Sequence, residues 1–461
     1  MDALAKMYKL FVRVGQTKIL CASFRQYFEN HVKRIVQDTE ASMVEDLLNT
    51  KALAETAINT AFLVEATPEA IVPSTSTPPP KKPDEIFVHA LNDAFSTGFK
   101  ARRKKPAEAL AKHLDKVLRK GQGDQTDAQY KTILDSVLSL YRYSDDKDVF
   151  RTFYHRQLAK RLLVGKSASD AFEKSMLKTL RDNYDAEFDQ AQNMFKDLEL
   201  AKDMMREYHE KLPDDHPGKN LFVTVLQTSA WPFATPKHTI TLPPELQAGL
   251  TRYDVKYYQK RHPKRKLTWD HSLGTMTLKG RFKAAPKELS VSLYQGVVLL
   301  LFNDNAELGY EEIRDATLLN DDDLRRTMQS LACGKKRVLK KVPHGPDVND
   351  GDTFHFNAEF VDPRSKIHIN SIQAKVSVQE SAKTNEDIEG DRKHVIDAAV
   401  VRIMKAKKEM AFELMINETI DAVKKHFKPE VSMIKKRIDV LVEDEYLERS
   451  EKDRNIFRYL A

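Results

Sequence analysis

Cysteine is scarce in this chain of 461 residues, which contains only Cys21 and Cys333. Two cysteines so far apart in the sequence cannot form a disulfide framework or supply a cysteine-rich zinc site. The scarcity therefore predicts a protein that resides in a reducing compartment and contains no structural metal.

Long apolar runs are missing as well. The longest, residues 297–302, is far too short to cross a bilayer, and residues 1–6 contain no apolar core of a signal peptide. We therefore expect no membrane contact and a location in the nucleus and cytoplasm.

Catalytic motifs are also absent. The sequence contains no recognisable metal-ligand cluster, nucleophile-elbow serine or Cys-His signature. Gly165-Lys166-Ser167 invites comparison with a phosphate-binding P-loop. That motif requires a glycine where Lys160 stands, and a strand where the preceding pattern is helical. We expect instead a helix end at Gly165, with Ser167 or Ser169 capping the next helix. The sequence thus predicts no catalytic residue and no cofactor.

Charge of both signs is abundant. Hydrophobic residues make up 41% of the chain and charged residues 31%, with a net charge of +7. This composition is typical of a helix-rich protein with about three domains or more. The mild net charge disfavours a dedicated nucleic-acid binder, and the basic residues 262–266 lack the interleaved aromatics of a nucleic-acid track.

Helical periodicity dominates the first part of the chain. Apolar residues repeat every three to four positions over residues 1–64 and 85–210, with one break at 121–124. Residues 67–83 are instead rich in serine, threonine and proline, which excludes helix and cannot form a core. We expect an exposed, mobile loop there.

Beyond residue 213 the pattern changes to short β-branched and apolar segments. Residues 222–226, 267–269, 275–278 and 289–293 are predicted strands, and residues 250–258 a short helix. Together they predict a small α/β unit.

Two units of similar design follow, at residues 294–375 and 395–461. Each combines three predicted helices with a two-stranded hairpin, which is the plan of a winged helix. The polar, acidic residues 376–394 between them are expected to form a linker that serves as a hinge.

The second of these units begins with an amphipathic helix. Ile396, Val400 and Ile403 recur at spacings of three and four and mark the stripe that should be buried. Lys405 lies about 200° around the helical wheel from Ile403 and should point into solvent or toward a partner. By periodicity alone this is an ordinary solvated helix face.

The local sequence is more specific than its periodicity. Val401-Arg402-Ile403-Met404-Lys405 closely resembles the (I/V)VRIMK motif of the cullin family. Further segments follow in the order of the cullin C-terminal module, at residues 433–438, 445–449 and 458–461. The internal cullin motifs DVFxxFYxxxLAKRLL, SAS and ExSML are matched at residues 148–163, 167–169 and 173–177, in a form most similar to the cullin-4 subfamily.

This resemblance implies a mainly α fold with a small α/β sheet. The implied domains are a partial last helical cullin repeat (1–97), a helical bundle (98–212), a small α/β RING-binding unit (213–293), winged helix A (294–375) and winged helix B (395–461). The family's earlier repeats, which carry the adaptor site, have no counterpart here. We therefore expect either a fragment or a form that has lost adaptor binding.

The resemblance also implies a function. Cullins are non-catalytic scaffolds of ubiquitin ligases in ubiquitin-dependent protein degradation, and the lysine of their motif accepts a ubiquitin-like modifier (neddylation). Lys405 is thus expected to carry the modifier through an isopeptide bond. In the family this modification frees the last winged helix from a closed arrangement.

The resemblance implies partners as well. A RING-box protein, which recruits a ubiquitin-conjugating enzyme, should add a strand to the α/β unit. A β-propeller adaptor is expected through the absent N-terminal repeats. The expected RING-box contacts are Phe222, Val223, Val225, Leu267, Trp269, Met276 and Leu278.

A winged helix that binds DNA is the alternative. The third helix of winged helix B offers Lys435, Lys436 and Arg437 to phosphates. Asp439 and the acidic residues 443–445 follow on the same helix and would be repelled by a DNA backbone. We therefore favour the scaffold.

Overall fold

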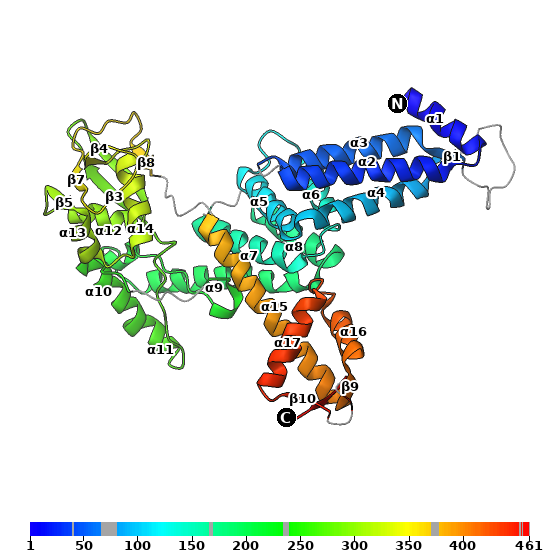
Figure 1. Cartoon of the computed structure of the whole chain (residues 1–461). Helices are drawn as coiled ribbons and strands as arrows, with labels where there is room; N and C mark the ends of the chain where they lie inside the picture. The colour runs from blue at the N-terminus through cyan, green and yellow to red at the C-terminus, as the bar shows by residue number, and fades with distance from the viewer. Residues whose placement is uncertain are drawn as a thin grey trace. The chain divides into compact units, whose positions relative to one another are not determined.

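The computed structural model describes residues 1–38, 41–65, 81–165, 169–233, 239–369, 378–450, 453 and 455–460. The chain divides into two compact units, drawn in Figure 1. The first comprises residues 1–158, 167–189 and 382–461, and the second comprises residues 159–166 and 190–381. Each unit is described by itself.

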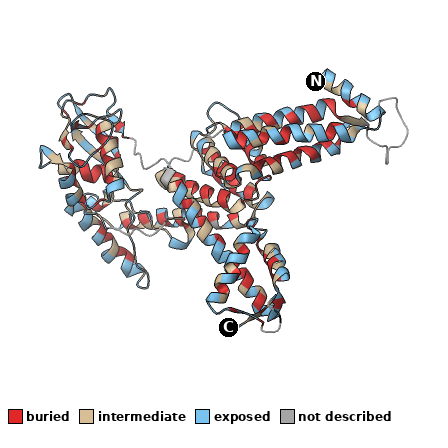
Figure 2. Ribbon diagram, viewed as in Figure 1, coloured by how far each residue is buried: buried red, intermediate tan, exposed pale blue. Residues whose placement is uncertain are grey.

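Helices make up the N-terminal part of the first unit. They are α1 (Asp2–Arg13), α2 (Thr17–Asp38), α3 (Met43–Ala61), α4 (Glu85–Phe99), the 3₁₀ turn η1 (Lys100–Arg102), α5 (Lys104–Lys120), α6 (Asp127–Tyr141), α7 (Lys147–Val164), α8 (Asp170–Asn183) and the 3₁₀ turn η2 (Ala186–Phe188). Residues 159–164 of α7 belong to the second unit. Helices α2, α3 and α4 lie side by side, with their buried residues between them (Figure 2). Phe62 stacks on Phe87 with ring centroids 4.1 Å apart, and the Tyr8 hydroxyl donates to Asp84 at 2.8 Å. These contacts join α1 and α4 in one hydrophobic core.

Helix ends in this part follow local signals. Gly121 (φ 72°) ends α5, and Thr126 caps α6 in a capping box with Gln129. Gly165 (φ 63°) ends α7, and the Ser169 hydroxyl accepts from Phe172 N at 3.4 Å at the start of α8. The predicted break at 121–124 and the predicted helix end at Gly165 are confirmed; Ser167 lies outside the described residues.

The serine- and proline-rich loop was predicted to extend to residue 83, and its last three residues instead form a strand. Strand β2 (Lys81–Pro83) pairs antiparallel with β1 (Leu63–Glu65), because residues 81–83 can bond to the extended chain that leaves α3. Residues 66–80 lie outside the described part of the chain.

The C-terminal part of the first unit is a winged helix. The last helix turns of α15 (Val378–Lys407) lead into β9 (Glu409–Ala411), α16 (Phe412–Val423), α17 (Val431–Glu443), β10 (Leu447–Arg449) and β11 (Ile456–Tyr459). The strands form an antiparallel sheet in the order β10-β11-β9. Three helices and a small sheet therefore surround the predicted core of this unit.

The linker expected at 376–394 is instead helical from residue 378 onward, as the first half of α15. Thr384, Ile388 and Arg392 are buried at spacings of four, so this half does have a helical stripe. The stripe is mostly polar, and for that reason hydrophobic periodicity missed it. Residues 376 and 377 lie outside the described residues.

After residues 159–166, the second unit continues with α9 (Asp189–Glu210), which belongs to it from Gln190 onward. Its further helical elements are η3 (Pro217–Asn220), η4 (Thr228–Ala230), α10 (Pro244–Arg252), the π-helical turn η5 (Tyr253–Tyr258), α11 (Gln259–Arg261), α12 (Leu293–Leu301), α13 (Tyr310–Thr317), α14 (Asp321–Met328) and the π-helical turn η6 (Gln329–Cys333). Its strands are β3 (Thr275–Arg281), β4 (Pro286–Ser292), β5 (Glu307–Gly309), β6 (Leu339–Val342), β7 (Thr353–Phe356) and β8 (Lys366–His368).

Two sheets organise this unit. In one the order is β3-β4-β8, with β3 and β4 antiparallel and β8 parallel to β4; in the other the order is β5-β7-β6. Helices α12, α13 and α14 pack with the second sheet around one core, as expected for a winged helix. The hairpin predicted there forms between β6 and β7.

Two predicted strands of the α/β unit are wrong. Residues 275–278 and most of 289–293 do lie in β3 and β4, but 222–226 and 267–269 belong to no sheet of the described residues. Their β-branched pattern suits an extended chain, yet a strand also requires a bonded neighbour. Among the described helices, none combines the length and apolarity needed to cross a membrane.

Candidate functional site

Lys405 lies on the last turn of α15 and its side chain is exposed. Ile396, Val400 and Met404 are fully buried on the opposite side of the helix, in the core of the winged helix. Ile403 is only partly buried, so Met404 takes the inner position that periodicity had assigned to Ile403. The motif therefore has an inner residue, Met404, and an outer residue, Lys405, next to each other.

The end of α15 is held in place by the sheet. Lys408 adopts a left-handed conformation (φ 68°) and donates its N–H to Met404 O at 2.8 Å. Its carbonyl accepts from Tyr459 N at 2.9 Å, and its amine lies 5.3 Å from the centre of the Tyr459 ring. The backbone that carries Lys405 is thus tied to β11 three residues later.

The lysines around Lys405 are engaged. Lys407 Nζ lies 3.9 Å from Glu418 Oε1, Lys408 lies over Tyr459, and Lys435 Nζ lies 5.9 Å from the centre of the Phe412 ring. Lys405 and Arg402 are both exposed, and within the described residues the Lys405 amine has neither an ion pair nor a hydrogen bond. Lys405 is therefore the amine of this group that is open to attack an incoming electrophile.

Helix α17 is tied to α15 by a charged pair. Arg437 Nε and Nη2 donate to the two carboxylate oxygens of Asp397 at 2.7 and 2.6 Å. Hydrogen bonding to Asp397 raises the pKa of Arg437. Of the three cations that the DNA-binding alternative requires, Arg437 is thus committed to the fold and Lys435 lies over an aromatic ring.

The second candidate region is the extended segment 221–227, which lies along α9. Leu221 O lies 3.0 Å from His209 Nε2, Val223 N donates to Met205 Sδ at 3.2 Å, and Gln227 N donates to Asp197 Oδ2 at 2.9 Å. Leu221 and Gln227 both have extended torsions (φ −95°, ψ 127° and φ −83°, ψ 120°).

These bonds use only one edge of the segment. In an extended chain, backbone groups of successive residues point to opposite sides, so the odd-numbered residues face α9. The backbone groups of Phe222, Thr224 and Leu226 then face away, and among the described residues no backbone bond joins them to another strand. The segment therefore presents an open edge.

The expected RING-box contacts fall into separate places. Val223, Val225, Leu267 and Trp269 pack together against a cluster of tyrosines, while Phe222 is 76% exposed. Met276 and Leu278 instead pack against the core of the first winged helix. Met276 Sδ would lie 1.8 Å from a Cβ at Gly296, which shows how closely β3 approaches α12. The structure thus brings five of the seven residues to one segment pair and places Met276 and Leu278 in a core. Met276 also packs, as Trp269 does, against a small cluster of Leu242, Leu250, Leu293 and Val297.

Sequence reasoning missed Asp197, Met205 and His209, which hold this segment. Their spacings of eight and four place them on one face of α9, a signal that becomes readable only once a neighbour for that face is known. Asp197 also accepts from Trp231 Nε1 at 3.0 Å. Within the described part of the chain, no group of three or more His, Cys, Asp or Glu side chains is placed to hold a metal ion.

Comparisons with protein families match three parts of the chain. The Cullin alpha solenoid domain matches residues 1–205, the Cullin alpha+beta domain residues 225–360, and the Cullin protein neddylation domain residues 391–453. The third match contains Lys405 and its motif.

Curated relatives agree with the families. Cullin-4A of Mus musculus and of Homo sapiens are each 40% identical over 99% of this chain and 58% of theirs. Cullin-3A of Arabidopsis thaliana is 35% identical over the whole of this chain and 61% of its own length. The chain thus spans about three fifths of the length of these relatives. A chain of the solved complex "A Dual E3 Mechanism for Rub1 Ligation to Cdc53: Dcn1(P)-Cdc53(WHB)" is 33% identical, with 18% of this chain and 94% of that chain covered and a TM-score of 0.17.

Proposed function

The chain belongs to the cullin family, and on that premise we propose that it is the non-catalytic scaffold subunit of a ubiquitin ligase. In this proposal it binds a RING-box protein and is activated when a ubiquitin-like modifier is attached to Lys405. The observation that carries the proposal is an exposed, unpaired lysine on a fixed helix end, inside the region that matches the neddylation domain.

The proposed chemistry at Lys405 is acyl transfer. The neutral amine attacks the carbonyl carbon of a thioester between the modifier and its conjugating enzyme. A C–N bond forms, the C–S bond breaks, the enzyme's thiolate leaves and the amine loses a proton. Because Met404 is buried while Lys405 is exposed, the amine can reach a thioester without any change in the core.

The RING-box protein is proposed to bind at the open edge of residues 221–227. A peptide that adds a strand gains backbone hydrogen bonds for affinity and uses alternate side-chain pockets for selectivity. Here the open backbone groups of Phe222, Thr224 and Leu226 would pair with the added strand. Leu267 and Trp269 pack on the same tyrosine cluster and would lie beside it.

We propose the remaining partners by analogy with the family. A ubiquitin-conjugating enzyme would arrive on the RING of the RING-box protein, and the ligase would mark proteins for ubiquitin-dependent degradation in the nucleus and cytoplasm. A β-propeller adaptor would bind the earlier helical repeats that the resemblance to cullins implies.

The DNA-binding alternative receives less support. Arg437 pairs with Asp397, and exposed acids Asp439, Glu443 and Asp444 occupy the same helix or its end. A groove-facing helix with these acids would be repelled by phosphates.

The test is a reconstituted conjugation with the purified chain, a RING-box protein, and the charging and conjugating enzymes of the modifier. We expect one added band of modifier size in the wild type and in the control Lys407→Arg, and none in Lys405→Arg. A band that persists in Lys405→Arg would place the acceptor elsewhere. No RING-box binding and no band would overturn the ligase proposal, and a DNA-binding assay would then follow.

A further inference from the structure

The open edge of residues 221–227 ends at a turn, and one buried carboxylate bridges that turn. Asp197 Oδ2 accepts from Gln227 N at 2.9 Å and from Trp231 Nε1 at 3.0 Å, so it holds the residues on both sides of η4. Gln227 and Trp231 both have extended torsions (φ −83°, ψ 120° and φ −113°, ψ 132°). Asp197 therefore fixes the direction in which the chain enters and leaves the turn.

The turn also closes the edge. Gln227 O accepts from Ala230 N at 3.0 Å while Gln227 N donates to Asp197, so both backbone groups of Gln227 are already bonded. Within the described residues, the last backbone groups that face away from α9 without a partner strand are those of Leu226. A strand that adds to this edge must therefore end or diverge opposite Gln227, and Asp197 helps to set that point.

Asp197 is the strongest acceptor among the three α9 side chains that hold the segment. Met205 offers a thioether, which is a weak acceptor, and His209 bonds a single carbonyl, that of Leu221. Asp197 offers a carboxylate to two donors, and hydrogen bonds to an ionised acceptor are roughly twice as strong as those between neutral groups. Its removal should therefore loosen the segment more than the loss of either other contact.

The burial of Asp197 defines how it can act on a partner. Asp197 and Trp231 are only 5% and 6% exposed, and among the described residues Asp197 has hydrogen bonds but no ion pair. A carboxylate without a counter-charge is costly to bury unless its hydrogen bonds compensate. It also lies on the side of the segment opposite the open edge, so it cannot touch an added strand. Asp197 can act on a partner only through the segment that it holds.

Holding an edge in place before a partner arrives favours association. A segment that must first become extended loses backbone freedom on binding, which weakens affinity. The apparent affinity then falls in proportion to the fraction of molecules in which the edge is already extended. A side chain that raises this fraction therefore speeds association without contacting the partner.

We propose that Asp197 is a positioning residue for strand addition. By joining Gln227 to Trp231 it keeps residues 222–226 extended in the free chain, with their open backbone groups ready to pair. The identity of the added strand, that of a RING-box protein, rests on the proposed function. The ordering of the segment by Asp197 does not, and it can be measured in the chain alone.

The test compares variants of the full chain. Asp197→Ala removes the acceptor, and Asp197→Asn keeps an oxygen of the same reach without the charge. Trp231→Phe retains Asp197 and a buried ring but removes one donor, the indole N–H. The matched control is Asp203→Asn, the same change at a residue of α9 whose side chain is 63% exposed and pairs with Arg206.

Two properties are measured, hydrogen exchange in the free chain and the kinetics of binding to an immobilised RING-box protein. In Asp197→Ala we expect the Gln227 amide to exchange about tenfold faster, because its acceptor is lost. Association should be about tenfold slower while dissociation stays within about twofold of the wild type, because the edge must be ordered before it pairs. Asp197→Asn and Trp231→Phe should lie between Asp197→Ala and the wild type, and Asp203→Asn should match the wild type.

Thermal unfolding of each variant separates positioning from general damage to the fold. Asp197→Ala that is less stable, but whose folded fraction associates as fast as the wild type, would give Asp197 a structural role and overturn the proposal. Equal slowing in Asp203→Asn would overturn it too, as would faster dissociation with unchanged association, which indicates a direct contact. If Asp197→Ala does not fold, Asp197→Asn and Trp231→Phe decide by the same criteria.

The outcomes also distinguish this proposal from the proposed function. A wild-type chain that binds the RING-box protein, with variants that associate equally fast, overturns the positioning role and leaves the ligase scaffold intact. A wild-type chain that binds no RING-box protein overturns both.

Discussion

Arg437 on α17 donates two parallel hydrogen bonds of 2.7 and 2.6 Å to Asp397 on α15, and both side chains are about four-fifths buried. The pair joins the helix that carries Lys405 to the third helix of the same winged helix. Bidentate arginine–carboxylate pairs fix orientation as well as distance. Lys405 therefore extends from a helix whose rotation is set by a charged pair as well as by the apolar core.

Replacing Arg437 should loosen this winged helix. Arg437→Met leaves the carboxylate of Asp397 partly buried without its donor, and we expect a loss of about 1–3 kcal/mol in local stability. The measurement is hydrogen exchange of the slowest amides of α17. Lys424→Met is the control, because its pair with Asp421 is more than half exposed and should be worth less than about 0.5 kcal/mol. Equal losses in both variants would contradict a specific role for the pair.

Proline at Thr224 should separate binding from folding. Its N–H lies on the open edge, so Thr224→Pro should leave stability within about 0.5 kcal/mol of the wild type. It should nevertheless weaken RING-box binding by about tenfold or more, since proline cannot donate to an added strand. Calorimetric titration and thermal unfolding give the two values.

The matched variant for that experiment is Val223→Pro, on the edge that faces α9. It removes the N–H that donates to Met205 Sδ, so we expect a loss of stability before any partner is added. Unchanged RING-box binding by Thr224→Pro would show that the added strand lies elsewhere.

Acid should destabilise the helical part of the first unit through His155. Burial lowers the pKa of His155 to about 4, and the charge of Arg151 adds to the shift. A histidine whose pKa is depressed by folding contributes stability that is complete above its ordinary value of 6.5 and is lost as the pH falls toward 4. Between pH 6.5 and pH 5 the loss should be roughly 2 kcal/mol.

Calorimetric unfolding at both pH values tests this expectation. His155→Phe should lose less stability than the wild type over this interval, because phenylalanine does not titrate. His89→Gln removes an exposed histidine and should keep the full acid sensitivity. Equal sensitivity in His155→Phe would assign the effect to other groups.

The first winged helix contains a buried pair whose disruption should be costly. Lys341 Nζ donates to Asp352 Oδ2 at 2.9 Å, and their side chains are 4% and 3% exposed. Lys341→Met leaves the buried Asp352 carboxylate without its counter-charge, although Asn349 N still donates to Oδ2 at 2.8 Å, and we expect a loss of about 3–5 kcal/mol. Lys340→Met changes the neighbouring, exposed lysine of β6 and should cost less than about 0.5 kcal/mol in denaturant unfolding. A small loss in Lys341→Met would mean that Asp352 finds water or another donor.

Local signals were readable from the sequence. Glycines at 121 and 165 end helices because they adopt left-handed torsions there, and Ser169 caps the next helix with its own hydroxyl. The exposure of Lys405 also follows from short-range periodicity. In each case the physics involves residues within one or two turns of each other.

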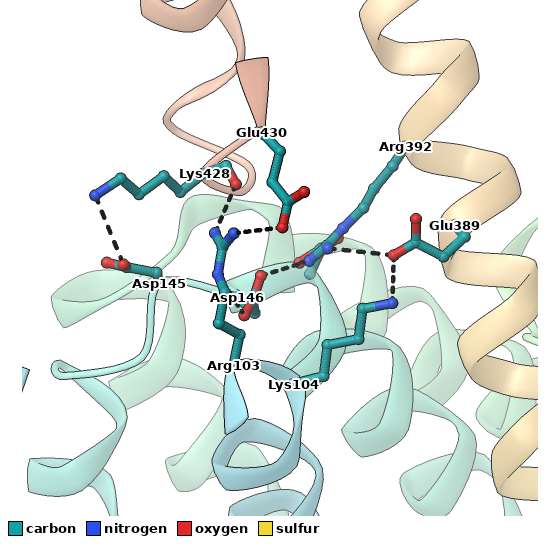
Figure 3. Close-up of polar contacts among 9 residues, drawn as sticks. Arg103, Lys104, Asp145, Asp146, Glu389, Arg392, Lys428 and Glu430 are labelled. Atoms are coloured by element: carbon teal, nitrogen blue, oxygen red, sulfur yellow. Dashed lines mark hydrogen bonds and ion pairs between the residues drawn. The ribbon is translucent and has the colours of Figure 1, made fainter. Parts of the chain in front are cut away.

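Two predictions were wrong because the structure of those segments depends on residues far away in the sequence. Residues 378–394 form a helix because a polar stripe meets partners more than 200 positions earlier, with Arg392 on Asp146 and Asp148 (Figure 3). Residues 222–226 form no sheet because the side chains of α9 occupy one edge and no described strand occupies the other. The residues that contact each segment cannot be inferred from the sequence of the segment alone.

The sequence by itself determined the family, the position of the motif at residues 401–405 and the face on which Lys405 lies, since these depend on residue identity and helical period. Only the tertiary structure decided which amine is unpaired, which backbone edge is open, and which charges hold the last winged helix. Those properties depend on burial and on groups distant in the chain, because the strength of an ion pair or hydrogen bond is set by the dielectric and geometry around it.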